Sequence, residues 1–259
     1  MDLFVPALSS PSSAVVITGG ASGIGLATAE ALAAVGRPMA LWDINEAAAV
    51  AAAERIATSR GIAAIGIGID LRDLGAIEPA LTRTRAAVGR PGGLVHCAGT
   101  VDTASIDGLT AESWDNGIAV HLRAFAFLVK ALQPDMAGQE GSAVVAVASI
   151  NATLGNGINP VYTAAKGGLL SLVRSLADRL ARDGIRVNSV SPGQIETPMM
   201  QPALAALPPR TVEKRILLER PRRAGEGGRA IRFLLSAEAS YVTGAELVVD
   251  GGNISSQRG

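Results

Sequence analysis

Three side chains between positions 149 and 166 could together move a proton to or from the oxygen of an alcohol or carbonyl. Tyr162 and Lys166 are four residues apart, so on a helix they share one face. A phenol has an unperturbed pKa of about 10, too high for efficient acid–base work near neutrality. A neighbouring cation lowers that pKa, and Ser149 would hold the substrate oxygen. None of these groups stores a hydride, so the chemistry needs a cofactor bound elsewhere in the chain.

A glycine-rich turn between a predicted strand (14–18) and a predicted helix (24–35) could bind that cofactor. Glycines permit a tight turn and a close approach of backbone N–H groups to phosphate, and the helix N-terminus favours a pyrophosphate. The spacing is Gly-x-x-x-Gly-x-Gly and not the commonest dinucleotide fingerprint. Turn formation alone would also explain glycines, so the position between strand and helix carries the prediction. The expected contacts are Gly19, Ser22, Gly23, Ile24 and Gly25.

Asp43 ends the second predicted strand, roughly 20 residues after the glycine turn. In dinucleotide-binding folds, an acid at about this distance from the turn binds the adenosine ribose. Its carboxylate would repel the 2′-phosphate of NADP, and no arginine follows immediately. Asp43 could instead cap the helix that starts near Glu46, or be an exposed acid at the strand end. The sequence therefore favours NAD as the cofactor, with Asp43 and Ile44 among its contacts.

Short apolar runs alternate with Ala-rich helical stretches, which predicts an α/β fold with a doubly wound, seven-stranded parallel sheet and helices on both faces. The expected strands are 14–18, 39–43, 63–69, 94–97, 143–148, 186–190 and 246–249, and the expected helices include 24–35, 46–60, 74–88, 111–136 and 161–183. Since no linker interrupts the alternation, we expect one domain over 1–259. Residues 1–13 would be an N-terminal extension, and the Pro-containing segment 194–228 a substrate-side flap.

Composition excludes several classes of protein. Lys plus Arg and Asp plus Glu both number 23, and this balance gives no support for a nucleic-acid partner. One cysteine cannot form an intrachain disulfide, which favours a reducing compartment. The N-terminus lacks the features of a signal peptide, and no apolar run is long enough to span a membrane. We expect a soluble, cytoplasmic protein with no membrane partner.

Four segments, in this order, make the chain resemble the short-chain dehydrogenase/reductase family from about Ala14 to Gly252. They are Thr18-Gly-Gly-Ala-Ser-Gly-Ile-Gly25, Tyr162-Thr-Ala-Ala-Lys166, Ser191-Pro-Gly-Gln-Ile-Glu-Thr197, and Val242-Thr-Gly with Asp250-Gly-Gly. Ser149 precedes Tyr162 by the separation at which this family places its catalytic serine. The resemblance implies a Rossmann-type fold and hydride transfer between a nicotinamide and an alcohol or carbonyl carbon. It also implies a homotetramer, or a homodimer, formed through the helices that begin near Ala111 and Val161.

Carried over by position, Tyr162 resembles the family's general acid/base and Ser149 the group that orients the substrate oxygen. Lys166 would lower the pKa of Tyr162 and bind the nicotinamide ribose. The further cofactor contacts that the resemblance implies are Asp70, Leu71, Cys97, Ala98, Gly99, Pro192, Gly193, Ile195 and Thr197. Simpler alternatives stay open, because Asp70 and Thr197 could be helix caps and Pro192-Gly193 only a turn. No metal site is expected.

Two departures from the family pattern involve histidines. The family usually has Asn-Asn-Ala-Gly where this chain has His96-Cys97-Ala98-Gly99, so amide contacts to neighbouring strands should be lost. Cys97 is either a small buried hydrophobe or a reactive thiol. His121 stands where the family places an Asn that is associated with a proton-relaying water. A histidine titrates near neutrality, so His121 could support an altered relay and count among the catalytic residues. It could equally be a structural residue inside a long helix.

The predicted function is oxidation–reduction between NAD(H) and a secondary alcohol or ketone. Met199, Met200, Leu204 and Leu207 in the flap suggest a moderately apolar or cyclic substrate, although they could equally pack a lid against the domain. One alternative is an NADPH-dependent ketone reductase of the 3-oxoacyl type. Another is a catalytically impaired nucleotide sensor or scaffold, because function depends on the site and not on the fold.

Overall fold

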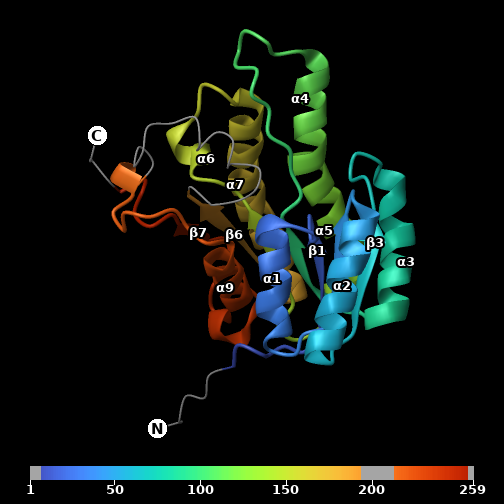
Figure 1. Ribbon diagram of the computed structural model, residues 1–259. Coiled ribbons are helices and arrows are strands. Elements are labelled where there is room, and N and C mark those ends of the chain that lie inside the picture. The colour runs from blue at the N-terminus through green and yellow to red at the C-terminus, as the bar shows by residue number, and fades with distance from the viewer. Residues whose placement is uncertain (1–6, 194–212, 256–259) are drawn as a thin grey trace.

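A seven-stranded parallel sheet forms the centre of the protein, with the strand order β3-β2-β1-β4-β5-β6-β7 (Figure 1). The computed structural model describes residues 7–193 and 213–255. The strands are β1 (Ala14–Thr18), β2 (Met39–Asp43), β3 (Ala64–Gly68), β4 (Pro91–His96), β5 (Ala143–Val147), β6 (Arg186–Pro192) and β7 (Glu246–Val249). The predicted fold class is confirmed.

Helices cover both faces of this sheet. They are α1 (Gly23–Ala33), α2 (Glu46–Arg60), α3 (Ile77–Val88), α4 (Ala111–Ile118), α5 (Ala124–Met136), α6 (Asn151–Leu154), α7 (Pro160–Leu180) and α9 (Ala224–Leu235). Short 3₁₀ turns occupy Leu74–Ala76, Ala181–Asp183, Glu213–Arg215 and Ala237–Ala239. In the described part of the chain, no helix combines the length and apolarity that crossing a membrane requires.

Two apolar cores form because successive residues of each strand point to opposite faces. Val16 and Leu94 belong to the core beneath α3, α5 and α7. Val15 and Val95 belong to the core beneath α1, α2 and α9. Burial on both faces explains why the strands are apolar throughout and do not alternate with polar residues.

Helix α9 was not predicted, and it begins inside the segment expected to be an irregular flap. Gly225, Gly227 and Gly228 lower the intrinsic helix propensity of its first turns. Tertiary packing requires small residues there, because a Cβ on Gly228 would lie 2.5 Å from the carbonyl oxygen of Ala27 in α1. Close contact between the two helices therefore outweighs the propensity of the glycines.

The predicted helix 111–136 is present, but a π-helical turn at Ala119–Arg123 separates α4 from α5 (Figure 1). Turns of this kind insert one extra residue and are frequent at functional sites. His121 lies in the middle of this turn, so its direction differs from that in a regular helix.

The carboxyl ends of the strands meet along one edge of the sheet, where Asp43 ends β2 and Pro192 ends β6. The chain reverses its direction of winding between β1 and β4, and open α/β sheets bind ligands at such a point. A cavity of about 740 Å³ lies there.

Candidate active site

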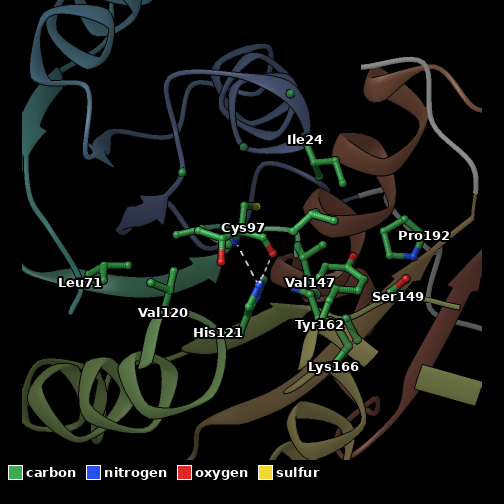
Figure 2. A pocket seen from close by; sticks show the side chains of 18 of the residues that line it. Ile24, Leu71, Cys97, Val120, His121, Val147, Ser149, Tyr162, Lys166 and Pro192 are labelled. Atoms are coloured by element: carbon green, nitrogen blue, oxygen red, sulfur yellow. Dashed lines mark hydrogen bonds between the residues drawn. The ribbon is translucent and has the colours of Figure 1, made fainter. Parts of the chain in front are cut away.

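The cavity brings together every predicted site residue in the described part of the chain. Its walls include Gly19, Ser22, Gly23, Ile24, Gly25, Asp43, Ile44, Asp70, Leu71, Cys97, Ala98, Gly99, His121, Ser149, Tyr162, Lys166, Pro192 and Gly193. Figure 2 shows Ser149, Tyr162 and Lys166 gathered on one side of the view and Leu71 on the other. Two further predicted contacts, Ile195 and Thr197, lie outside the described residues.

The glycine-rich turn has the shape that a diphosphate requires. A Cβ on Gly25 would lie 2.0 Å from the carbonyl oxygen of Gly19, and a Cβ on Gly19 would lie 2.9 Å from the backbone nitrogen of Ala98. By contrast, nothing lies within 4 Å of the equivalent position on Gly23, where α1 begins. The turn thus packs tightly against the protein at Gly19 and Gly25, whereas the space beside Gly23 at the helix N-terminus is open. The first N–H groups of the helix have no partner within the helix. A nicotinamide dinucleotide fits this arrangement.

Asp43 lies beside the glycine turn because its carboxylate accepts hydrogen bonds from two backbone N–H groups. Oδ2 accepts from Ala21 at 3.1 Å, and Oδ1 accepts from Asn45 at 3.0 Å. The cap of α2 is Asn45, whose side chain accepts from Ala48 at 3.1 Å. Asp43 is therefore not the cap of α2, and its position suits the ribose role.

Asp70 is held by a charged neighbour that the sequence analysis did not single out. Both of its carboxylate oxygens accept from Arg72 Nε at 3.0 Å, and this pairing lowers the pKa of Asp70. The 3₁₀ turn that follows is capped by Asp73, which accepts from Gly75 at 2.9 Å. The alternative in which Asp70 caps a helix is thus wrong. Arg72 also lines the cavity.

Tyr162 and Lys166 lie one turn apart on α7, and the Lys166 Nζ is 5.5 Å from the centre of the phenol ring. That Nζ donates to the carbonyl oxygen of Val147 at 2.6 Å, and burial lowers the Lys166 pKa to about 8. Burial raises the pKa of Tyr162, and the neighbouring Ser149 hydroxyl opposes the rise. In this structure, desolvation of the phenol therefore outweighs the lowering of the Tyr162 pKa that was expected from its neighbours.

The π-helical turn places the His121 ring edge-on to Tyr162, with 5.4 Å between ring centres. The His121 Nε2 lies 2.7 Å from the carbonyl oxygen of Thr100 and 3.1 Å from its backbone nitrogen, so it donates to the first or accepts from the second according to the tautomer (Figure 2). Nδ1 is buried and has no hydrogen-bond partner in the described residues. Burial, followed by the charge of Lys166, lowers the pKa of His121 to about 2. A relay that depends on titration of His121 near neutrality is therefore not supported.

His96 restores the contacts that the loss of an amide was expected to remove. Its Nδ1 accepts from the Thr18 hydroxyl at 2.9 Å, and its Nε2 donates to the backbone carbonyl of His121 at 3.1 Å. Burial lowers the pKa of His96 to about 3, so the ring stays neutral. The side chain joins the end of β4 to β1 and to the π-helical turn, so the two unusual histidines contact each other.

Cys97 behaves as a small apolar residue. Burial raises the pKa of its thiol to about 12, although Lys166 and Arg222 oppose the rise. A thiol with that pKa stays protonated near neutrality, and the protonated form is a poor nucleophile. Of the two alternatives, the structure favours the unreactive one.

Sequence reasoning missed a set of polar residues around the catalytic end of the cavity. They are Thr100, Asn116, Asn151, Asn156 and Asn159. Three of these asparagines lie in the short stretch between Ser149 and Tyr162. This density of amides in the sequence could have indicated that they belong to the site.

Comparisons with known proteins agree with this geometry. Residues 19–253 match the family model described as "Enoyl-(Acyl carrier protein) reductase". The chain is 34% identical over 244 residues to the "Probable galactose dehydrogenase" of Rhizobium meliloti, covering 92% of this chain and 93% of that one. It is 36% identical over 238 residues to the cis-4-hydroxycyclohexanecarboxylate dehydrogenase of Sinomonas cyclohexanicum, covering 92% and 94%. The crystal structure of L-sorbose reductase from Gluconobacter frateurii, complexed with NADPH and L-sorbose, has a TM-score of 0.87 at 28% identity, covering 95% and 97%.

Proposed function

Because this chain belongs to the short-chain dehydrogenase/reductase family, we propose that it interconverts a secondary alcohol and its ketone with NAD(H). The observation that carries the proposal is that Ser149, Tyr162 and Lys166 line one cavity, with Tyr162 and Lys166 one helical turn apart on α7. These groups line the same cavity as a glycine turn that suits a diphosphate. A bound nicotinamide would accept the hydride in oxidation and donate it in reduction.

The chain's own residues hold the substrate oxygen and move its proton. Ser149 Oγ accepts from the backbone N–H of Asn151 at 3.2 Å, which positions the hydroxyl in the cavity wall to hold the substrate oxygen beside Tyr162. Tyr162 takes the alcohol proton in oxidation and returns it in reduction. The Lys166 ammonium, with a pKa of about 8, is charged at neutral pH and stabilises the phenolate as the proton leaves.

Preference for NAD rests on Asp43. Its carboxylate is held at the end of β2 by Ala21 and Asn45, where the adenosine ribose of a bound dinucleotide would lie. A 2′-phosphate on that ribose would face a negative charge. The glycine turn would hold the diphosphate, and Lys166 the nicotinamide ribose.

One observation favours an NADPH-dependent ketone reductase as a second candidate. The Arg72 guanidinium lines the cavity and could pair with a 2′-phosphate if it left Asp70. Titration of the purified protein with NADH and with NADPH, followed by the fluorescence of the reduced nicotinamide, separates the two candidates. Tighter binding of NADPH would overturn the NAD preference without affecting the proposed chemistry.

The catalytic role is tested with the two tyrosines of the chain. Tyr162→Phe should reduce turnover of secondary alcohols at least about 1,000-fold, because no other phenol lies in the described cavity wall. NADH binding should stay close to wild type. Tyr241 is fully exposed, so Tyr241→Phe is a matched control that should keep full activity. Substantial activity in Tyr162→Phe would contradict the mechanism.

The oligomeric state and the location in the cell also belong to the proposal. We expect a homotetramer, or a homodimer, whose interface includes α4, α5 and α7, and a cytoplasmic location. Trp114 on α4 and Phe127 on α5 are each 42% exposed, which is unusual for aromatic side chains of this size. Sedimentation of the protein with and without Phe127→Glu tests the interface.

A further inference from the structure

We propose that the substrate of this site is a neutral polyol or the corresponding keto sugar, and that Asn151, Asn159 and His121 recognise its additional hydroxyl groups. The inference rests on the proposed function and names the substrate class. It replaces the expectation of a moderately apolar substrate, which depended on flap residues outside the described part of the chain.

Asn159 occupies the N-cap position of α7 but does not cap the helix. An asparagine at this position usually accepts from a backbone N–H of the first turn and contributes about 1 kcal/mol by doing so. Here Oδ1 is buried without a hydrogen-bond partner among the described residues, and the residue lines the cavity. An unpaired buried acceptor costs about 1–3 kcal/mol. A ligand that donates a hydrogen bond would remove this cost.

The place of Asn159 just before α7 relates it to the reacting oxygen. It precedes Tyr162 by three residues, at the non-helical position before the first turn of α7, and both residues line the same cavity. A substrate that fills this cavity can therefore place a hydroxyl on the Asn159 amide while Tyr162 holds the reacting oxygen.

Asn151 lies two residues after Ser149, at the start of α6. Its backbone N–H holds Ser149 Oγ, whereas its side-chain amide has no hydrogen bond in the described part of the chain and lines the cavity. Asn156 differs, because its Oδ1 already accepts from Ile158 at 3.0 Å and shapes the loop. Asn151 and Asn159 are thus two amides of the cavity wall with capacity for a ligand near the catalytic pair.

His121 adds a second buried polar atom without a partner to the same cavity wall. Its Nε2 faces the backbone N–H and carbonyl groups of Thr100, whereas its Nδ1 has no partner in the described residues. The Asn159 oxygen requires a hydrogen-bond donor, and Nδ1 requires a donor or an acceptor according to the tautomer; a hydroxyl group supplies both and an apolar ring supplies neither. Of the cations in the described cavity wall, Lys166 donates to Val147 and Arg72 pairs with Asp70. The recognition chemistry therefore favours a neutral polyol over a phosphorylated or carboxylated substrate.

The first experiment compares substrates of similar carbon number. Initial rates with sorbitol and galactitol are measured beside those with 2-hexanol and cyclohexanol, each with NAD⁺ and with NADP⁺. A site with unpaired buried polar atoms should prefer its polyol by at least about 100-fold in kcat/KM, since each unmade hydrogen bond costs about 1–3 kcal/mol. Equal or better use of the simple alcohols would overturn the substrate class while leaving the proposed function intact. Failure of all substrates, and of their ketones, would count against the proposed function itself.

The second experiment assigns the preference to the amides. Asn159→Leu should lower kcat/KM for the polyol at least about 10-fold, mainly by raising KM. The kcat/KM for 2-hexanol should stay unchanged. Thr163→Val is the matched control, because its hydroxyl on α7 is also buried and unpaired but does not line the cavity. It should not alter the ratio of polyol to alcohol activity. Asn159→Asp keeps the acceptor and should retain polyol use, which guards against a folding defect in Asn159→Leu. An unchanged ratio in Asn159→Leu, or the same loss in Thr163→Val, would refute recognition by Asn159.

Discussion

Arg222 is 5% exposed, yet none of its guanidinium nitrogens has a hydrogen-bond partner in the described residues. It lines a small cavity of about 100 Å³ with Leu218, Val249 and Asp250. The Asp250 carboxylate accepts from the backbone N–H groups of Gly252 and Ile254, each at 2.8 Å. The nearby carboxylate of Glu226 is already engaged by Arg220, at 2.9 Å and 2.6 Å from its two oxygens. We predict that Arg222→Met stabilises the protein, because methionine has a similar volume and no charge to desolvate.

The magnitude follows from the pKa of Arg222, which burial lowers from 12.5 to about 10. At 1.36 kcal/mol per unit, this shift corresponds to a cost of roughly 3 kcal/mol for keeping the cation buried. The folded-state pKa is lower than the unfolded one, so the cost is fully present below pH 10 and disappears as the pH rises beyond it. A gain of about 1–3 kcal/mol should raise the Tm by about 3–10 °C at neutral pH.

Thermal unfolding followed by circular dichroism, at one protein concentration, measures this effect. Arg220→Met is the control, because it removes an arginine that has a partner and should not stabilise the protein. An Arg222→Met protein that melts at or below the wild-type temperature would refute the argument from the unpaired charge. So would equal stabilisation by the control.

Four further predictions concern the site. Asp43→Ser should shift the ratio of NADH to NADPH affinity towards NADPH by about 10-fold, because the repelling carboxylate is gone; fluorescence titration with both cofactors measures the ratio, and no change would remove Asp43 from cofactor choice. His121→Asn should leave the pH profile of kcat/KM unchanged between about pH 5 and 9, since the pKa of His121 is about 2. A shift of either limb of that profile would support a proton relay through His121. Because burial raises the pKa of Tyr162, the phenol stays protonated through neutrality. Oxidation, which needs the deprotonated form, should accelerate as the pH rises, whereas reduction should stay nearly constant. Initial rates in both directions test this, and a reduction rate that falls through neutrality would contradict it. Gly25→Ala should weaken NADH binding at least about 10-fold, because its Cβ would lie 2.0 Å from the Gly19 carbonyl oxygen. Calorimetric titration with NADH measures the affinity, and an affinity equal to that of the wild type would contradict this prediction.

Local patterns were sufficient to predict most of the fold. The strands are apolar on both faces, so each appears in the sequence as a short apolar run, and the helices between them are long enough to recognise. Helix α9 is the exception, because its glycines are explained by the close approach of α1, which precedes it by almost 200 residues. A contact between segments so far apart leaves no periodic signal in either one.

The sequence by itself determined which residues meet in the candidate site. Tyr162 and Lys166 share a helix face because of their spacing. Ser149, Asp43 and Pro192 lie at one edge of the sheet, because the carboxyl ends of parallel strands meet there. Only the tertiary structure decided the protonation states of these groups. Burial acts against the charged forms of Tyr162, Lys166 and His121, and the partners that oppose it come from distant elements. The contact of His96 with the π-helical turn, and the unpaired polar atoms of Asn159 and His121, likewise depend on how separate segments pack in space.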